Sequence, residues 1–301
     1  MNDIAPGPDV VRVGSWNMDH DGLARNGDDR RWTTGMQVLA PLGLHVLLRQ
    51  EKTRAHAHGA ERMWAEAAVL GGEGPTFIPF LPKATHESAS PTCVYVDPLT
   101  FAPVKEPEHG TDMTHPISTP VVRLKGAPRN LTLGSIHLSS SCPDRRASES
   151  RYVTKLADEA LVGGDWNSPE GWPNPRVTPT DWREVKDTRH FQHRTIDGVS
   201  DTRPDEILSG RRDGHPPIYE ELGRYAAQKL GQPQALEPTA SLWRTDQGPM
   251  QRIDRIYATP RLAPALLSLE VIATQAVREA SDHALVVATF SLARLRDALG
   301  A

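Results

Sequence analysis

The sequence predicts a mixed fold, of the α/β or α+β class, because strand-like and helix-like segments alternate along most of the chain. Short apolar runs bounded by polar residues predict strands, among them residues 11–17, 45–51, 76–80, 92–96 and 269–274. Apolar residues at helical spacing predict a first helix through Trp32, Met36 and Leu39, which Pro41 closes. A short turn separates strand segments 121–124 and 131–138, which favours an antiparallel pair.

The other elements follow the same two patterns. A second helix, ended by Gly71 and Gly72, is expected to pack through Met63, Trp64, Ala67 and Ala68. A third helix is expected to pack through Val153, Leu156, Ala157 and Ala160. Residues 103–118 are rich in Pro and His without a period, so they predict a surface loop, and a short helix is expected at 261–268.

The chain divides into a core region and three less regular parts. Residues 1–9 predict a flexible N-terminal arm, 10–292 a single domain, and 293–301 a C-terminal tail. Within the domain, 170–238 shows little alternation and many charges, and predicts an insertion that shapes the substrate cleft. One amphipathic helix is expected inside it, through Ile218, Leu222, Tyr225, Ala226 and Leu230. A separate lid is the alternative, but the insertion has few apolar residues for its own core.

Composition limits the class of protein. A chain of 301 residues with 38% hydrophobic and 24% charged residues fits a globular protein, and 26 prolines with 23 glycines imply much loop. The formal net charge of −4 gives no global attraction to nucleic acid, so any contact with a polyanion must be local.

No apolar run approaches the roughly 20 residues of a membrane span, and the N-terminus lacks a signal-peptide pattern. These two features predict a cytoplasmic protein. The two cysteines, Cys93 and Cys142, have no metal-binding spacing and are expected to be free thiols rather than a disulfide.

Residues 161–169, Leu-Val-Gly-Gly-Asp-Trp-Asn-Ser-Pro, carry the densest chemical signal. The apolar start predicts the end of a buried strand, and the two glycines allow a close backbone approach. On a strand, Asp165 and Asn167 point to the same side while Trp166 points into packing. The carboxylate suits a divalent cation or a water, and the amide can donate to a phosphate oxygen. A simple turn, in which both side chains cap backbone groups, is the alternative.

Five further segments place polar residues at or beside strand ends: Trp16-Asn17, Gln50-Glu51, His137-Leu138, Ile253-Asp254 and Ser281-Asp282-His283. With Gly164-Asp165-Trp166-Asn167 between the third and the fourth, this order resembles the endonuclease/exonuclease/phosphatase superfamily, the DNase I-like fold. The resemblance extends from Val11 to Phe290. It implies a four-layer sandwich of two packed mixed β-sheets flanked by helices, with a site where strand ends from both sheets meet.

The resemblance also implies a metal-dependent hydrolase of phosphoester bonds. Such hydrolysis needs a cation on the phosphate, a base for the water and an acid for the leaving oxygen. The metal ligands, for Mg²⁺ or Mn²⁺, are expected to be Glu51, Asn17 and Asp282. The catalytic residues are expected to be His137, Asp165, Asn167, Asp254 and His283, with Asp254 holding one ring nitrogen of His283. Which histidine is the acid and which the base is left open.

Supporting residues follow from the same resemblance. Asn167, Arg54 and Thr239 are expected to bind substrate. Glu87 is the candidate to support the first catalytic histidine, and a solvated loop position is the favoured alternative for it. From their position in the sequence, two basic pairs follow site strands, namely Lys52 with Arg54 and Arg145 with Arg146. They could contact phosphates if both flank the cleft, and solvated surface positions are the alternative.

The sequence favours a nuclease acting on DNA or RNA, because no specialised phosphatase motif is present. It lacks the Trp-Cys-Asp-Arg motif of inositol polyphosphate phosphatases and the Leu-Arg-Asp continuation of tyrosyl-DNA phosphodiesterases. A phosphatase or phosphodiesterase acting on a small or lipid phosphate is the alternative. A binding protein that lost its chemistry predicts broken motifs, and none of the six is broken.

Overall fold

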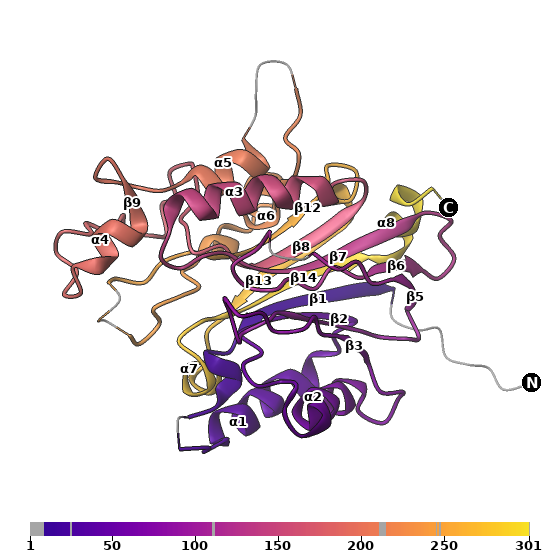
Figure 1. Cartoon of the computed structure of the whole chain (residues 1–301). Coiled ribbons are helices and arrows are strands. Elements are labelled where there is room, and N and C mark those ends of the chain that lie inside the picture. The colour runs from indigo at the N-terminus through magenta and orange to yellow at the C-terminus, as the bar shows by residue number, and fades with distance from the viewer. Residues whose placement is uncertain are drawn as a thin grey trace, which may run out of the picture.

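Two six-stranded mixed sheets pack face to face, and helices cover their outer faces (Figure 1). The computed structural model describes residues 9–24, 26–109, 112–210, 215–244, 246 and 248–300. The order helix, sheet, sheet, helix confirms the predicted α/β four-layer sandwich. The predicted N-terminal arm lies, except for Asp9, outside the described residues.

The first sheet has the strand order β13-β14-β1-β2-β4-β3. Its strands are β13 Leu266–Ile272, β14 Leu285–Ser291, β1 Val10–Asn17, β2 Val46–Gln50, β4 Cys93–Val96 and β3 Ile78–Phe80. The second sheet has the order β11-β12-β8-β7-β6-β5. Its strands are β11 Glu220–Glu221, β12 Asp254–Ala258, β8 Ala160–Asp165, β7 Asn130–His137, β6 Val121–Leu124 and β5 Phe101–Lys105.

Each sheet contains one parallel pair, β1 with β2 and β7 with β8, and the other neighbours are antiparallel. A separate hairpin is formed by β9 Thr195–Ile196 and β10 Val199–Ser200. Because parallel neighbours end at the same edge of a sheet, each parallel pair delivers two strand ends to one place.

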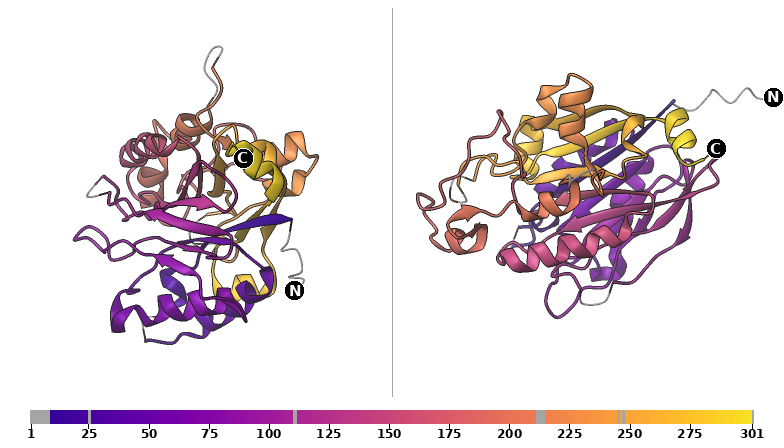
Figure 2. Two further views of the ribbon diagram at one scale, coloured as in Figure 1. Left: turned by 90° about the vertical axis from the view of Figure 1, so that its right-hand side faces the viewer. Right: turned by 90° about the horizontal axis from the view of Figure 1, so that it is seen from above.

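Helices on both outer faces bury their apolar sides. The first sheet is covered by α1 (Arg30–Leu39), α2 (Glu61–Gly71) and α7 (Gln275–Ala280), and the second by α3 (Pro143–Val153) and α5 (Arg203–Ser209). The main core lies between the sheets and also takes residues from α6 (Leu222–Lys229) and α8 (Leu292–Ala298). The hairpin and α4 (Arg189–Arg194) extend past one end of the sheets (Figure 2).

Single turns of 3₁₀ helix complete the described elements: η1 His20–Gly22, η2 Ala40–Leu42, η3 Ala57–Ala60, η4 Thr154–Leu156, η5 Pro233–Leu236 and η7 Ala263–Ala265. The helix predicted at 261–268 was therefore largely wrong. Only η7 is helical there, because β13 begins at Leu266 and pairs with β14.

Two predicted helix faces were wrong in detail. The third helix ends at Val153, and Ala160 instead starts β8, where its ladder with Thr132 holds it. In α2, Trp64 is 52% exposed and the buried face is Met63, Glu66 and Ala67. The buried face of α2 differs from the predicted one because the Glu66 carboxylate points inward, where it pairs with the buried cations Arg49 and Lys52.

Two regions expected to be irregular contain regular structure. β5 occupies the start of the predicted loop 103–118, and its Phe101 is buried in the main core. The predicted C-terminal tail forms most of α8, whose Leu295 is buried, and Leu299 beyond it packs into the same core. These apolar residues hold the end of the chain against the sheets.

Part of the insertion at 170–238 belongs to the two-sheet sandwich itself. β11 pairs with β12 at the edge of the second sheet, and the predicted amphipathic helix is present as α6.

Cys93 is buried and Cys142 exposed, both as free thiols, as predicted. None of the helices in the described ranges is long and apolar enough to cross a membrane.

Candidate active site

Three neighbouring strands of the second sheet bring their site residues into register. His137 is paired with Asp165 in the parallel ladder of β7 and β8, and Asp165 is paired with Asp254 in the antiparallel ladder of β8 and β12. The sheet therefore sets these three residues side by side, although the chain separates them widely. The prediction that these strand ends meet is confirmed.

The first sheet adds Asn17 and Glu51 to the same place. Asn17 ends β1 opposite Gln50, and Glu51 follows in a left-handed conformation with φ 56°. The Asn17 amide donates to Glu51 Oε1 at 3.2 Å and to Asp165 Oδ2 at 3.1 Å. Asn17 thus connects the site residues of the two sheets.

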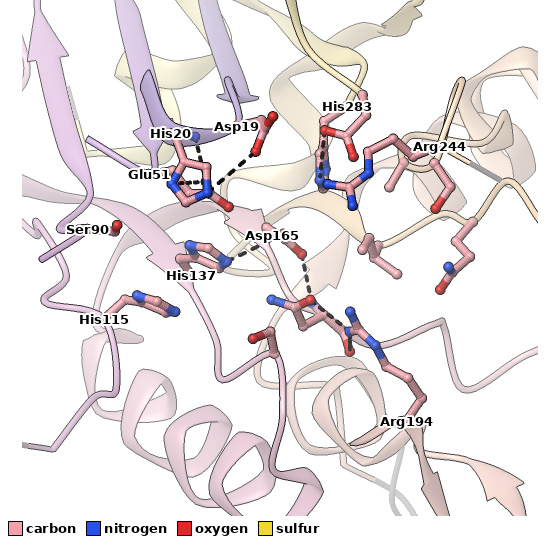
Figure 3. A pocket seen from close by; sticks show the side chains of 17 residues that line it. Asp19, His20, Glu51, Ser90, His115, His137, Asp165, Arg194, Arg244 and His283 are labelled. Carbon is pink, nitrogen blue, oxygen red and sulfur yellow. Dashed lines mark hydrogen bonds and ion pairs between the residues drawn. The ribbon is translucent and has the colours of Figure 1, made fainter. Parts of the chain in front are cut away.

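A cavity of about 310 Å³ opens at this junction (Figure 3). Of the predicted site residues, Glu51, His137, Asp165, Asn167, Asp282 and His283 line it. Asn17 and Asp254 are buried beside it and bond to residues that line it. Eight of the ten predicted residues are therefore gathered at one cavity.

His283 and Asp254 form a buried pair. The ring Nδ1 of His283 lies 2.9 Å from Asp254 Oδ2 and 3.1 Å from Oδ1. Burial lowers the pKa of His283, but the carboxylates of Asp254, Asp165 and Asp282 outweigh it and raise this pKa well above its ordinary value. The ring is therefore a cation at neutral pH, and its Nε2 lies 4.0 Å from Asp282 Oδ1.

Glu51 is ionised and held in place by three groups. Besides Asn17, the backbone N–H of His20 donates to Glu51 Oε2 at 2.7 Å. Burial raises the pKa of Glu51, but His137, the His20 N–H and the Asn17 amide lower it to about 2. The carboxylate is therefore charged across the physiological range.

Asp19 and His20 also line the cavity and were not predicted as site residues. They lie in the polar stretch that follows β1. Both have positive φ, 33° and 58°, and Asp21 after them is buried and paired with Arg49. The Asp-His-Asp sequence directly after a site strand was the available signal.

His137 has a different environment from His283. Its Nε2 lies 3.5 Å from Asp165 Oδ2, and its ring stacks on His115 with centroids 4.2 Å apart. Burial first, and then the neighbouring His137, lower the pKa of His115 to about 3, so His115 stays neutral. Glu87, the predicted support for this histidine, is instead half exposed and lies 3.5 Å from Arg145.

Asn167 lies two residues after the end of β8 and takes a left-handed φ of 50°. Its amide nitrogen donates to Leu138 O at 2.9 Å, and its backbone N–H donates to Asp165 Oδ1 at 2.9 Å. Arg194, which the sequence did not single out, donates to Asn167 Oδ1 at 2.7 Å. Trp166 is buried against Tyr257, as predicted.

Two predicted substrate contacts lie outside the cavity. Arg54 is exposed and is not among the lining residues. Thr239 is buried, and its hydroxyl accepts the backbone N–H groups of Ile253 and Asp254, so it positions the start of β12.

Two further basic residues are unavailable to a substrate. Lys52 is fully buried between Asp21 and Glu66, each at 2.7 Å. Arg146 is buried against Asp201. The sequence left phosphate contact or a solvated surface position open for both, and each is instead buried and paired with an acid that lies far from it in the sequence.

The donor set near Glu51 fits a hard divalent cation. Asp19, His20 and Glu51 offer ligand atoms that lie within 4.8 Å of one another. Two of the three are carboxylates, which Mg²⁺ and Mn²⁺ prefer. A second group, Asp165, Asp254 and His283, also meets this distance, but its imidazole and one of its carboxylates already bind each other.

Two packed mixed sheets flanked by helices have the architecture of the DNase I-like fold. Comparison with solved structures bears this out. Humanized D. rerio TDP2 matches with a TM-score of 0.62 and 16% identity, over 94% of this chain and 99% of that one. The human Nocturnin catalytic domain matches with a TM-score of 0.58 and 14% identity, over 94% and 93%.

ANGEL2, a 2',3'-cyclic phosphatase, matches with a TM-score of 0.58 and 16% identity, over 93% of this chain and 95% of that one. No family model matches the sequence, and no curated protein matches it either. The comparisons therefore establish the fold.

Proposed function

We propose that this chain is a divalent-metal-dependent hydrolase that cleaves phosphodiester bonds of DNA or RNA. One observation carries the proposal: strand ends from both sheets bring an ionised Glu51, the Asp165 carboxylate and the cationic His283 to one cavity. These groups match what the reaction needs, namely a cation site, a base and a proton donor.

Each side chain has a role that follows from its contacts. Asp165 accepts hydrogen bonds from Asn17 and Asn167, which leaves it an oriented carboxylate that can accept the proton of an attacking water. His283 is held through Nδ1 by Asp254, so its Nε2–H can donate to the phosphate or to the leaving oxygen. His137, beside Asp165, is the second acid–base group.

The cation would be held by Glu51 with Asp19, His20 and Asp282, and Asn17 would keep the Glu51 carboxylate in position. When bound, Mg²⁺ or Mn²⁺ supplies positive charge that neutralises the phosphate. Lining residues other than the ligands position and protonate the substrate.

Similar folds support a nucleic-acid substrate. D. rerio TDP2, which matches over 93% of this chain with a TM-score of 0.57 and 15% identity, has a structure with a single-strand DNA product. A small phosphate ester is the second candidate, because Lys52 and Arg146 are buried and the net charge is −4. These facts reduce the electrostatic attraction expected for a polyanion.

The test is an activity panel with Mg²⁺ or Mn²⁺ and plasmid, single-stranded DNA, RNA and small phosphate esters as substrates. We expect cleavage of at least one nucleic acid and its loss in excess EDTA. If the protein hydrolyses only small phosphate esters with both metals, the nuclease proposal is wrong and the second candidate, a small phosphate ester as substrate, replaces it.

A variant pair ties the activity to the site. Glu51→Gln should lose activity and bind Mn²⁺ more weakly by calorimetry, whereas the exposed Glu61→Gln on α2 should match the wild type. Full turnover in EDTA, or equal Mn²⁺ affinity in the two variants, contradicts a metal site at Glu51.

A further inference from the structure

Arg194 brings a positive charge from the insertion to the cavity. It is the last residue of α4 and lines the cavity beside Asn167. One guanidinium nitrogen donates to both oxygens of Asn167, to the backbone O at 2.9 Å and to Oδ1 at 2.7 Å. Figure 3 places Arg194 on the far side of Asp165 from Glu51.

No carboxylate in the described part of the chain forms an ion pair with Arg194, although Asp165 attracts it from a greater distance. Its Nε is buried without a hydrogen-bond partner. Burial, and then the nearby Arg146, lower the pKa of Arg194 to about 10, which still leaves it charged at neutral pH. Withdrawing a charge from solvent without a counter-ion is costly, and Arg194 is partly withdrawn, with its Nε buried.

Arg194 is partly buried, and the fully buried arginines among the described residues are paired with carboxylates. Arg252 lies 2.7 Å from Glu221 and 3.4 Å from Glu170, and Arg49 contacts Glu66 and Asp21 at 2.7 and 2.9 Å. Arg194 differs from them because, among the described residues, it donates hydrogen bonds to two neutral oxygens of one residue, Asn167, and to no carboxylate. The described residues therefore supply no anion at ion-pair distance from Arg194.

We propose that Arg194 binds a non-bridging oxygen of the substrate phosphate at the Asn167 end of the cavity. A guanidinium is planar and presents several N–H donors, which suits bidentate contact with phosphate oxygens. The proposal rests on the proposed phosphoesterase function and assigns the insertion a direct part in binding substrate.

A purely positional role is the competing explanation. In that case Arg194 only holds the loop after β8 through Asn167, and phosphate never touches it. The two explanations differ in an observable that needs neither metal nor turnover, the affinity of the protein for inorganic phosphate.

The first experiment measures phosphate binding by calorimetry in EDTA for wild type, Arg194→Gln and Arg189→Gln. Arg189 lies on the same helix, is 77% exposed and pairs with Asp187, so it is the matched control. We expect about tenfold weaker binding or more in Arg194→Gln, the scale for losing a charge-assisted contact. Equal affinities in all three proteins overturn the proposal.

The second experiment compares kcat/KM on an oligonucleotide, on bis(p-nitrophenyl) phosphate and on p-nitrophenyl phosphate. Loss of one donor that stabilises transition-state charge lowers the rate by about 10²–10³-fold. We therefore expect kcat/KM of Arg194→Gln to be lower than that of the wild type by this factor, and kcat/KM of Arg194→Lys to lie between the two. If the loss extends to both small esters, the bound group is the phosphate that reacts. If only the oligonucleotide is affected, Arg194 binds a neighbouring phosphate of the strand.

A third measurement uses the wild-type protein and covers the case in which Arg194→Gln does not fold. Phenylglyoxal modifies accessible guanidinium groups, and peptide mapping locates the modified residue. Inorganic phosphate should slow modification of Arg194 and leave Arg189 unaffected, and equal modification of Arg194 with and without phosphate overturns the proposal. Phosphate binding at Arg194 without hydrolysis of any ester refutes the proposed function alone, whereas full hydrolysis by Arg194→Gln refutes only this inference.

Discussion

Adjacent residues of one short segment belong to two charge clusters with opposite properties. Arg49 and Lys52 belong to a buried cluster with Asp21 and Glu66, in which all four side chains have zero exposure. Glu51, between them in the sequence, points instead into the cavity with Asp19, Asp165 and Asp282. The first cluster pairs two cations with two anions, whereas the second brings four carboxylates to one cavity that the cations His283 and Arg194 also line.

The difference separates a structural role from a functional one. In the buried cluster every charge has a partner at 2.7–2.9 Å, so little remains to attract a ligand. In the cavity, burial raises the pKa of Asp282, and Asp19 adds to this against the opposing effect of His283. Carboxylates held close together repel one another and lower the stability of the protein, and a bound divalent cation relieves this repulsion. Active sites commonly accept lower stability for function in this way.

The largest expected effect concerns the two histidines of the cavity. His283→Ala and His137→Ala should each lose about 10²–10⁴-fold in turnover while remaining folded, the usual scale for acid–base groups. The exposed His86→Ala is the control. Steady-state rates together with circular dichroism check the prediction, and turnover within a few-fold of wild type in both variants excludes acid–base roles.

Glu66→Gln should act on stability. Arg49 and Lys52 would then share the single carboxylate of Asp21, and breaking a buried pair costs about 3–5 kcal/mol. Urea unfolding should show this loss, whereas Glu61→Gln on the same helix should change the free energy of unfolding little, because Glu61 is exposed. A similar midpoint in the two variants would mean that the buried cluster contributes little net stability.

The same cluster predicts a pH dependence of stability. Burial raises the pKa of Glu66, but Arg49 and Lys52 outweigh it and lower the pKa from 4.5 to about 2. Folding therefore favours the ionised form, and this stabilisation is complete above the unfolded value of 4.5 and is lost as the pH falls toward 2. The difference in unfolding free energy between wild type and Glu66→Gln should shrink over this range, and a constant difference contradicts the prediction.

The smallest expected effect is an increase in stability, caused by the substitution Asp282→Asn. The pKa of Asp282 is raised, so its ionised form opposes folding at neutral pH, and Asp282→Asn should stabilise the metal-free protein by about 0.5–2 kcal/mol. The same change should weaken Mn²⁺ binding. Melting in EDTA measures the first effect and calorimetry the second, with the exposed Asp297→Asn as control. A lower melting temperature would show that Asp282 supports the fold.

Much of the fold and the core of the site could be predicted from the sequence. The strand ends carrying Asn17, Glu51, His137, Asp165 and Asp254 are visible because an apolar run with a polar end is a local pattern. The positions of Arg54, Lys52 and Arg146 were misjudged because exposure depends on what covers a residue. Asp19, His20, His115 and Arg194 were missed because they lie in segments without periodicity.

The sequence by itself determined which segments become strands and helices and which polar side chains end them, since periodicity and turn chemistry act between near neighbours in the chain. Only the tertiary structure decided which charges meet. Asn17 reaches Asp165 across 148 positions, and Lys52 finds Glu66 on a helix of a different layer. Coulomb energy depends on distance and burial in space. A basic side chain therefore forms a structural ion pair at Lys52, whereas at Arg194 it lines the cavity without an ion pair to any described carboxylate.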